Sequence, residues 1–135
     1  MENVTLENDV TVFYLTAASF PDGIQNVHAR LHSLIADSKE RMTFGISRPE
    51  NGKIIYRVGF EEKYTGEGAV FDCATLVLKK GTYSCIRVID FMKDPVSIKN
   101  AFTTLLSQPN FDREGYCVEW YLNDRDVDCM LRMAD

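Results

Sequence analysis

Two segments of this chain share one pattern of apolar residues, and this repetition is the strongest constraint on its fold. The apolar positions of the first segment return in the second at one constant offset, as Ile24, Val27 and Leu31 and then Ile98, Ala101 and Leu105. Apolar residues at this spacing form the buried stripe of an amphipathic helix. The pattern predicts two helices in equivalent positions of a duplicated unit.

One strand-like run precedes each predicted helix and two follow it. The runs cover residues 10–19, 42–46 and 54–60 in the first half and residues 82–90, 117–122 and 127–133 in the second. They are rich in β-branched and aromatic residues and are separated by turn-forming clusters. We predict an α+β fold with a duplicated strand–helix–strand–strand module. Its antiparallel sheet, joined through the first strands of the two modules, has two helices on one face and a ligand cleft on the other.

The length of 135 residues suits one domain. We assign residues 10–135 to this domain, with repeat one at 10–63, a connector at 61–72 that is rich in glycine and charge, and repeat two at 73–135. Residues 1–9 are polar and are expected to be loose.

The composition excludes several classes of function. A net charge of -5 argues against direct nucleic-acid binding, which needs clustered basic residues. The sequence has neither an apolar run of membrane-spanning length nor a basic leader, so we expect no membrane partner and a cytoplasmic location.

Neither cysteines nor histidines indicate a metal centre or a cofactor. The four cysteines lack the C-x-x-C spacing of zinc and redox sites, and we interpret them as reduced structural thiols, although their even number leaves disulfides open. His28 and His32 lie one helical turn apart without an acidic neighbour to complete a site. We predict no metal and no cofactor.

One carboxylate inside an aromatic strand is the main candidate for function. In the run from Cys117 to Leu122, Glu119 and Tyr121 alternate with Val118, Trp120 and Leu122. The apolar trio is typical of a core side, so Glu119 faces water, a partner or a cleft. Enclosing a charge without an ion partner costs several kcal/mol, which makes Glu119 the first functional candidate.

The second half resembles the GyrI-like small-molecule-binding family, which includes the effector-binding domains of MerR-type and AraC-type multidrug regulators. The matching residues are the run 78–83, an apolar-x-x-Gly-x-Tyr motif that ends at Tyr83, the helix with Phe102, and Glu119-Trp120-Tyr121 in place of a Glu-x-Tyr strand. The resemblance is specific over residues 78–133, and the first half matches in layout alone. It implies an aromatic cleft in which Glu119 attracts bulky lipophilic cations, in a stand-alone binder without a DNA-binding segment.

The resemblance and the positions of aromatic residues along the strands give the other candidate ligand-binding residues. The resemblance places Tyr83 and Tyr121 on the cleft side, where they can make cation–π contacts, although cross-strand packing explains them equally well. Tyr14 and Tyr56 are weaker candidates because their strand parity is uncertain. Trp120 is weaker because parity assigns it to the core. Phe20 and Phe91 either rim the cleft or form a hydrophobic staple at the start of a helix.

Three alternatives remain open on the sequence. Arg87 alternates with Tyr83 on one strand, and a contact with Glu119 would neutralise the acid and favour an anionic or zwitterionic ligand. A hydrolase that acts on reactive or strained-ring cytotoxic compounds needs a second acid near Glu119, and Glu61 is the candidate. A protein-interaction module, such as a topoisomerase inhibitor, or a homodimer would use a protein partner instead of a small hydrophobic or cationic ligand.

Overall fold

The computed structural model describes residues 1–135 and consists of an eight-stranded antiparallel sheet with three α-helices. Two short 3-10 helices span Ser38–Glu40 and Phe91–Lys93. In chain order the elements are β1 (Glu2–Leu6), β2 (Val10–Thr16), α1 (Ile24–Leu34), β3 (Thr43–Glu50), β4 (Lys53–Glu61), α2 (Glu67–Val70), β5 (Ala74–Leu78), β6 (Gly81–Val88), α3 (Ser97–Leu106), β7 (Cys117–Tyr121) and β8 (Val127–Arg132). The predicted α+β class and antiparallel sheet are confirmed.

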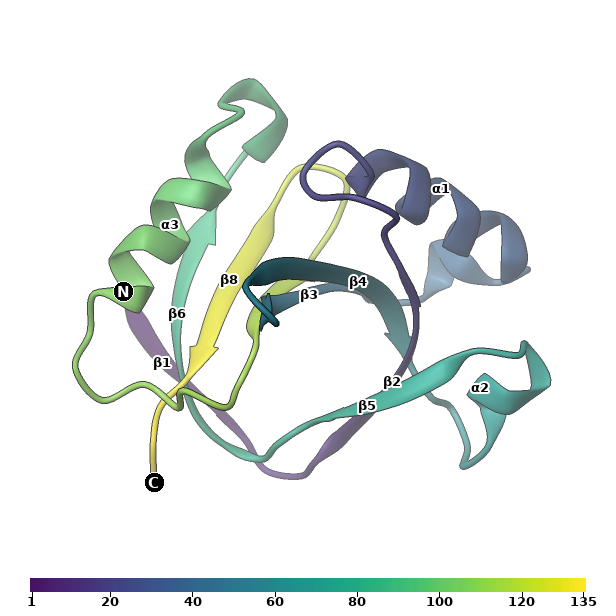
Figure 1. The fold of residues 1–135 in the computed structure, drawn as a ribbon, viewed down its shortest axis with the longest axis horizontal. Helices are drawn as coiled ribbons and strands as arrows, with labels where there is room; N and C mark the ends of the chain where they lie inside the picture. Colours follow the sequence, from purple (N-terminus) through teal and green to yellow (C-terminus); the bar gives the residue numbers. More distant parts are fainter.

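The order of strands across the sheet is β1-β6-β8-β7-β3-β4-β2-β5, and the sheet curls so strongly that its two ends approach each other (Figure 1). The two halves meet where β3 pairs with β7, in the middle of the sheet. The prediction that their first strands join is wrong, because β2 and β6 lie near opposite ends. β2 pairs instead with the edge strand β5, which precedes β6 in the sequence. β6 pairs with the edge strand β1, which precedes β2.

The N-terminal segment is ordered, contrary to the prediction for residues 1–9. β1 pairs with β6 in a continuous register from Glu2 opposite Cys85 to Leu6 opposite Gly81. The side chain of Asp9 then accepts a hydrogen bond of 2.8 Å from the backbone of Lys80. A polar sequence concealed this strand because an edge strand gains its stability from backbone pairing and needs only one partly buried side.

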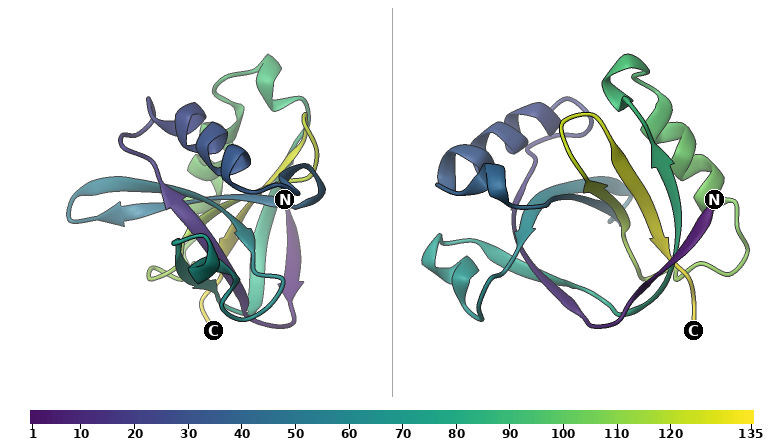
Figure 2. Two further views of the ribbon diagram at one scale, coloured as in Figure 1. Left: turned by 90° about the vertical axis from the view of Figure 1, so that its right-hand side faces the viewer. Right: turned by 180° about the vertical axis from the view of Figure 1, so that it is seen from behind.

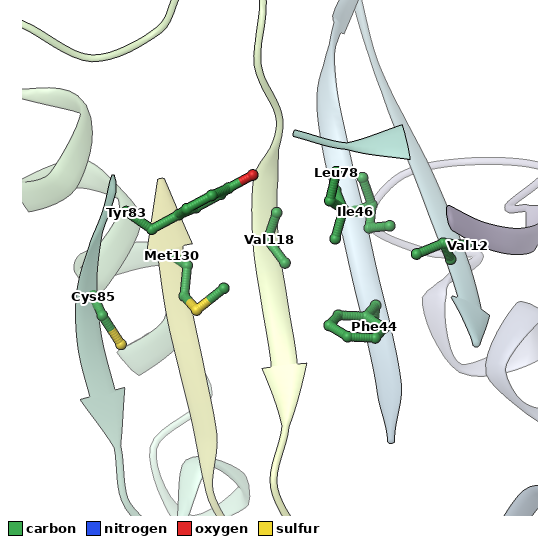
Figure 3. Packing of buried hydrophobic residues seen from close by; sticks show 8 residues of the cluster. All are labelled: Val12, Phe44, Ile46, Leu78, Tyr83, Cys85, Val118 and Met130. Carbon is green, nitrogen blue, oxygen red and sulfur yellow. The ribbon is translucent and has the colours of Figure 1, made fainter. Parts of the chain in front are cut away.

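The curl gives the sheet an inner face that forms a core by itself. Its buried residues come from strands far apart in the sheet and meet across the curl (Figure 3), as Val12, Phe44, Ile46, Leu78, Tyr83, Cys85, Val118 and Met130. Side chains on the other face cannot meet in this way and need covering elements.

The two long helices provide that cover on the outer face (Figures 1 and 2). Val27 and Leu31 of α1 pack on one half of the sheet, against Phe13, Val58 and Phe60. The other half is covered by α3, whose Ala101, Phe102 and Leu105 pack against Val127, Cys129 and Leu131. The predicted helical stripes are therefore the buried ones, and the central strands β3 and β7 lie between the two helices. No helix in the chain is both long enough and apolar enough to cross a membrane.

Candidate ligand-binding site

Glu119 lies at the centre of β7, opposite Gly45 of β3 and Cys129 of β8. Its neighbours Val118 and Trp120 face the inner core, in agreement with the predicted alternation. Glu119 was expected to face away from the helices, but it lies on the face that carries them. The physical reason is the curl: the inner face is already a closed apolar core, so the polar side of β7 turns outward, between α1 and α3.

Two tyrosines hold the Glu119 carboxylate. Tyr121 donates a hydrogen bond of 2.5 Å to Oε1, and Tyr56 of β4 donates one of 3.1 Å to the same oxygen. No protein group hydrogen-bonds Oε2. The absence of a side chain at Gly45 makes room for this arrangement, because a Cβ there would lie 2.6 Å from Oε1 and still closer to the Tyr56 hydroxyl.

No lysine or arginine pairs with Glu119. Arg87, the predicted rival, lies on the inner face and pairs with Asp128, its Nε 2.8 Å from Oδ1. The packed surroundings of Glu119 raise the pKa of its carboxyl through desolvation, and the two phenol hydrogen bonds offset only part of this effect. The residue nevertheless keeps part of its surface accessible to solvent. Glu119 is therefore an enclosed, partly exposed acid without a counter-ion.

Aromatic side chains surround this acid. Phe20 stacks on Tyr56 with ring centroids 6.0 Å apart, and Phe91 meets Tyr121 edge-on at 5.5 Å. His28 of α1 joins the two tyrosines, with its Nε2 2.9 Å from the Tyr56 hydroxyl and its ring 5.4 Å from that of Tyr121. Four predicted residues, two from each half of the chain, thus gather around Glu119.

His28 is a member of the site that the sequence interpretation missed. Burial, and to a smaller extent the neighbouring His32, lowers its pKa to about 4, so the imidazole is neutral near pH 7. Because Tyr56 donates its single hydroxyl proton to Glu119, the Nε2–H tautomer of His28 donates to the Tyr56 oxygen. The one feature of the sequence that could have identified His28 is its position on the buried stripe of the first helix, one residue after Val27.

A hollow of about 480 Å³ adjoins the Tyr56 side of the site. It lies between the chain that leaves β2 and the first residues of β4, and its lining includes Ala17, Phe20, Lys53, Ile54 and Tyr56. Six of its eight lining residues are apolar, which makes it suitable for an uncharged part of a ligand.

Three predicted ligand-binding residues lie away from Glu119, all on the inner face. Tyr83 is buried and donates to the Lys79 carbonyl at 2.7 Å. Trp120 packs on Phe44 with centroids 5.5 Å apart, and Tyr14 lies beneath the guanidinium of Arg57. A smaller hollow of about 200 Å³, lined by Tyr83, Val118, Tyr116 and the side chains of Arg48 and Arg132 among others, opens on this face. It contains none of the residues that surround Glu119.

Other candidate chemistry is not assembled around Glu119. Glu61 follows Tyr56 by five residues on β4, which at about 3.3 Å per residue separates them by roughly 17 Å along the strand. The four cysteines are free thiols. No group of three or more His, Cys, Asp and Glu side chains is arranged to hold a metal ion.

Several solved structures of other proteins have the same fold as this chain. An integron cassette protein from the mobile metagenome of Vibrio cholerae matches with a TM-score of 0.68 at 12% identity, over 98% of this chain and 94% of its own. The protein SAV2435, solved with bound tetraphenylphosphonium, matches with a TM-score of 0.63 at 13% identity, over 98% and 92%. A hydrolase from Listeria innocua matches with a TM-score of 0.59 at 10% identity, over 98% and 90%.

No protein-family model matches the chain, and no curated protein sequence does. At these identities the structural matches establish a shared half-barrel fold, one on which a cationic aromatic compound is bound in another protein. This supports the structural part of the resemblance seen in the sequence.

Proposed function

We propose that this protein binds amphipathic, aromatic cations in the space between α1 and α3, with Glu119 as the charge anchor. The observation that carries the proposal is an enclosed carboxylate with phenol partners and no counter-ion. Such a group is costly for the fold unless something compensates it. The tetraphenylphosphonium bound to SAV2435, a lipophilic cation on the same fold, supports this class of ligand.

The two parts of the site have separate roles in this proposal. The rings of Phe20, Tyr121 and Phe91, which keep exposed surface, supply apolar contact at about 25 cal/mol per Å² buried, and cation–π attraction adds about 0.5–2 kcal/mol. Tyr56 is buried and acts through its hydrogen bond to Glu119. Glu119 selects the sign of the charge, because an arriving cation supplies the missing partner of a poorly solvated anion. Its free Oε2 faces no competing donor from the protein.

Neutral His28 preserves this selectivity. A protonated imidazole beside Tyr56 would place a positive charge next to Glu119 and would compete with the ligand. Burial keeps the ring uncharged near pH 7, so His28 adds no positive charge beside Glu119. His28 also orients the hydroxyl of Tyr56 toward the carboxylate.

The hydrolase and protein-partner alternatives lack a comparable observation. Acid–base hydrolysis needs a second group within reach of the substrate atom held by Glu119, and Glu61 is far along β4. The tyrosine hydroxyls beside Glu119 have pKa values raised by burial and by the carboxylate itself, which makes them weak acids. A protein partner does not require the enclosed acid.

Calorimetric titration with tetraphenylphosphonium tests the proposal. Glu119→Gln keeps an acceptor oxygen for both tyrosines and replaces the charged carboxylate by a neutral amide, so we expect its Kd for this cation to rise by about 10-fold or more, the loss of roughly 1.4 kcal/mol. Neutral triphenylphosphine oxide should lose less than about 3-fold. The matched control is Glu40→Gln, an exposed acid without a hydrogen-bond partner, which should change neither Kd. Equal losses for the cation and the neutral compound would refute the role of charge.

A further inference from the structure

We infer that Glu119 accepts a hydrogen bond directly from its ligand, so that the site prefers protonated amines and amidinium ions with an aromatic body to quaternary ammonium or phosphonium ions of similar shape. This inference rests on the proposed function, because it specifies the chemistry of a cation that lies at Glu119. It divides lipophilic cations into two classes by one property, the presence of a hydrogen on the charged group.

The two oxygens of the Glu119 carboxylate have different surroundings. Oε1 accepts one hydrogen bond of 2.5 Å from Tyr121 and another of 3.1 Å from Tyr56. A carboxylate oxygen offers about two lone-pair sites to donors, so the two phenols occupy those of Oε1. Oε2 accepts no hydrogen bond from any group of the protein, and its sites remain free for another donor.

Oε2 also has contact with the solvent. The enclosed side-chain polar atoms that lack a hydrogen-bond partner are Arg57 Nε and Trp120 Nε1, and no atom of Glu119 is among them. Since Oε2 has no partner and is not enclosed, it keeps accessible surface, in agreement with the partial exposure of the residue. Oε2 is thus the atom of Glu119 that is open to a donor from outside.

No neighbouring side chain competes for this oxygen. Arg87 is paired with Asp128 on the inner face. His28 hydrogen-bonds the Tyr56 hydroxyl and makes no contact of this kind with the carboxylate. Cys129 lies opposite Glu119 on β8, but its thiol makes no hydrogen bond to the acid and is a weak donor in any case. Water or a ligand must therefore supply the donor for Oε2.

This arrangement distinguishes two kinds of cation. An ammonium or amidinium N–H donates a short, charge-assisted hydrogen bond to a carboxylate, with an N···O distance of about 2.7–2.9 Å. In a quaternary ammonium or phosphonium ion the charge lies behind methyl or phenyl groups, so it approaches the carboxylate less closely and brings no donor. When an aromatic body covers the site and displaces water, an Oε2 without a donor is unfavourable. The N–H cation avoids this loss.

Two salts with the same aromatic body test the inference: 4-biphenylmethyl-dimethylammonium chloride, which has one N–H at pH 7, and 4-biphenylmethyl-trimethylammonium chloride, which has none. We expect the first to bind the natural protein about 10-fold more tightly, as measured by calorimetric titration. In Glu119→Gln the ratio should fall to about 1 or below, because the amide nitrogen, a donor, takes the place of Oε2. The control Glu40→Gln, at an exposed acid without a hydrogen-bond partner, should keep the natural ratio.

Infrared difference spectra detect the hydrogen bond itself. Binding of the dimethylammonium salt should shift the antisymmetric carboxylate stretch of Glu119, and binding of the trimethylammonium salt should shift it less. The band should be missing from the difference spectrum of Glu119→Gln, which identifies it. Equal shifts with both salts would overturn the inference, because a direct N–H hydrogen bond is possible in only one of the two complexes.

The outcomes separate this inference from the proposed function. If both salts bind the natural protein equally while Glu119→Gln weakens both, N–H recognition is refuted and the charge anchor stands. The same holds if tetraphenylphosphonium binds and the dimethylammonium salt does not. If none of these cations binds at concentrations up to about 1 mM, the proposed function fails together with the inference. A preference for the N–H salt that persists in Glu119→Gln arises from another group and overturns the assignment to Glu119.

Discussion

The environments of two enclosed acids, Glu67 and Glu119, differ in whether the protein supplies a counter-ion. Glu67, at the start of α2, is 4% exposed and receives two hydrogen bonds from the Arg41 guanidinium, at 3.0 and 2.5 Å, and one of 2.8 Å from the backbone of Lys63. The Arg41 hydrogen bonds lower the pKa of Glu67. Desolvation raises that of Glu119, which has only phenol partners. The fold compensates the charge of Glu67 internally and gives Glu119 no counter-ion, which is the feature on which the proposed function rests.

The largest effect on stability is expected from breaking the ion pair between Arg41 and Glu67. Arg41→Met would leave Glu67 enclosed without a cation and would remove a guanidinium that lies over the rings of Phe13 and Phe60. We expect a loss of about 3 kcal/mol in the free energy of unfolding, or roughly 10 °C in Tm. Arg30→Met, at an exposed arginine without an ion pair, should change Tm little. A loss in Arg41→Met no larger than in Arg30→Met would contradict the comparison.

Crowding the uncompensated acid should have the next largest effect. In Gly45→Ala the new methyl group would meet both the Tyr56 hydroxyl and Glu119 Oε1. We expect about 2 kcal/mol of destabilisation, together with weaker binding of tetraphenylphosphonium. The double variant Gly45→Ala with Tyr56→Phe removes one of the two clashes, so the two changes should be non-additive in chemical denaturation. Strict additivity would show that the Gly45 position does not set this geometry.

Neutralising the two acids should give opposite changes in stability. Because the folded-state pKa of Glu119 is raised, the protonated form favours folding, and this contribution is lost as pH rises through the folded pKa. Glu119→Gln should therefore raise Tm near pH 7, by roughly 2–6 °C, and the difference should vanish near pH 4, below the usual glutamate value of 4.5.

The matching experiment on Glu67 has the opposite sign. The pKa of Glu67 is lowered, so its contribution to stability is present above the usual pKa and is lost as pH falls through the folded value. Glu67→Gln should lower Tm near pH 7, and less so in acid. Calorimetric scans of both variants and of the natural protein from about pH 4 to 8 measure how the two differences in Tm change with pH. A Tm for Glu119→Gln below that of the natural protein at pH 7 would contradict the conclusion that the charge of Glu119 is uncompensated in the folded protein.

The smallest effect is expected at Arg87. Since this arginine pairs with Asp128 on the inner face and is 60% exposed, Arg87→Met should leave the Kd for tetraphenylphosphonium unchanged within about 2-fold. Calorimetric titration of this variant, with Glu119→Gln as the sensitive reference, measures the difference. A tightening of about 10-fold would show that Arg87 screens Glu119 from the ligand.

Local patterns in the sequence predict the helices, most strands and the alternation within β7. Val27, Leu31 and Leu105 are buried because helical spacing places them on one stripe. The same reasoning identifies Glu119 and Tyr121 as neighbours on one side of a strand. It could not show which face of the sheet this side belongs to, because alternation distinguishes two faces without naming them. Trp120 lies against the inner core, as its parity indicates, whereas Tyr83, which the resemblance placed on the cleft side, is also on the inner face. Tyr56 was undervalued.

By itself, the sequence determined the duplicated α+β unit and the presence of a carboxylate among aromatic residues. Only the tertiary structure decided where that carboxylate points, that Arg87 is engaged elsewhere, and that His28, Gly45 and Tyr56 complete its surroundings. The physical reason is that the curl of the sheet and the pairing of β3 with β7 join residues from distant parts of the chain. Local periodicity contains no information about such contacts, whereas the charge environment of Glu119 depends on them entirely.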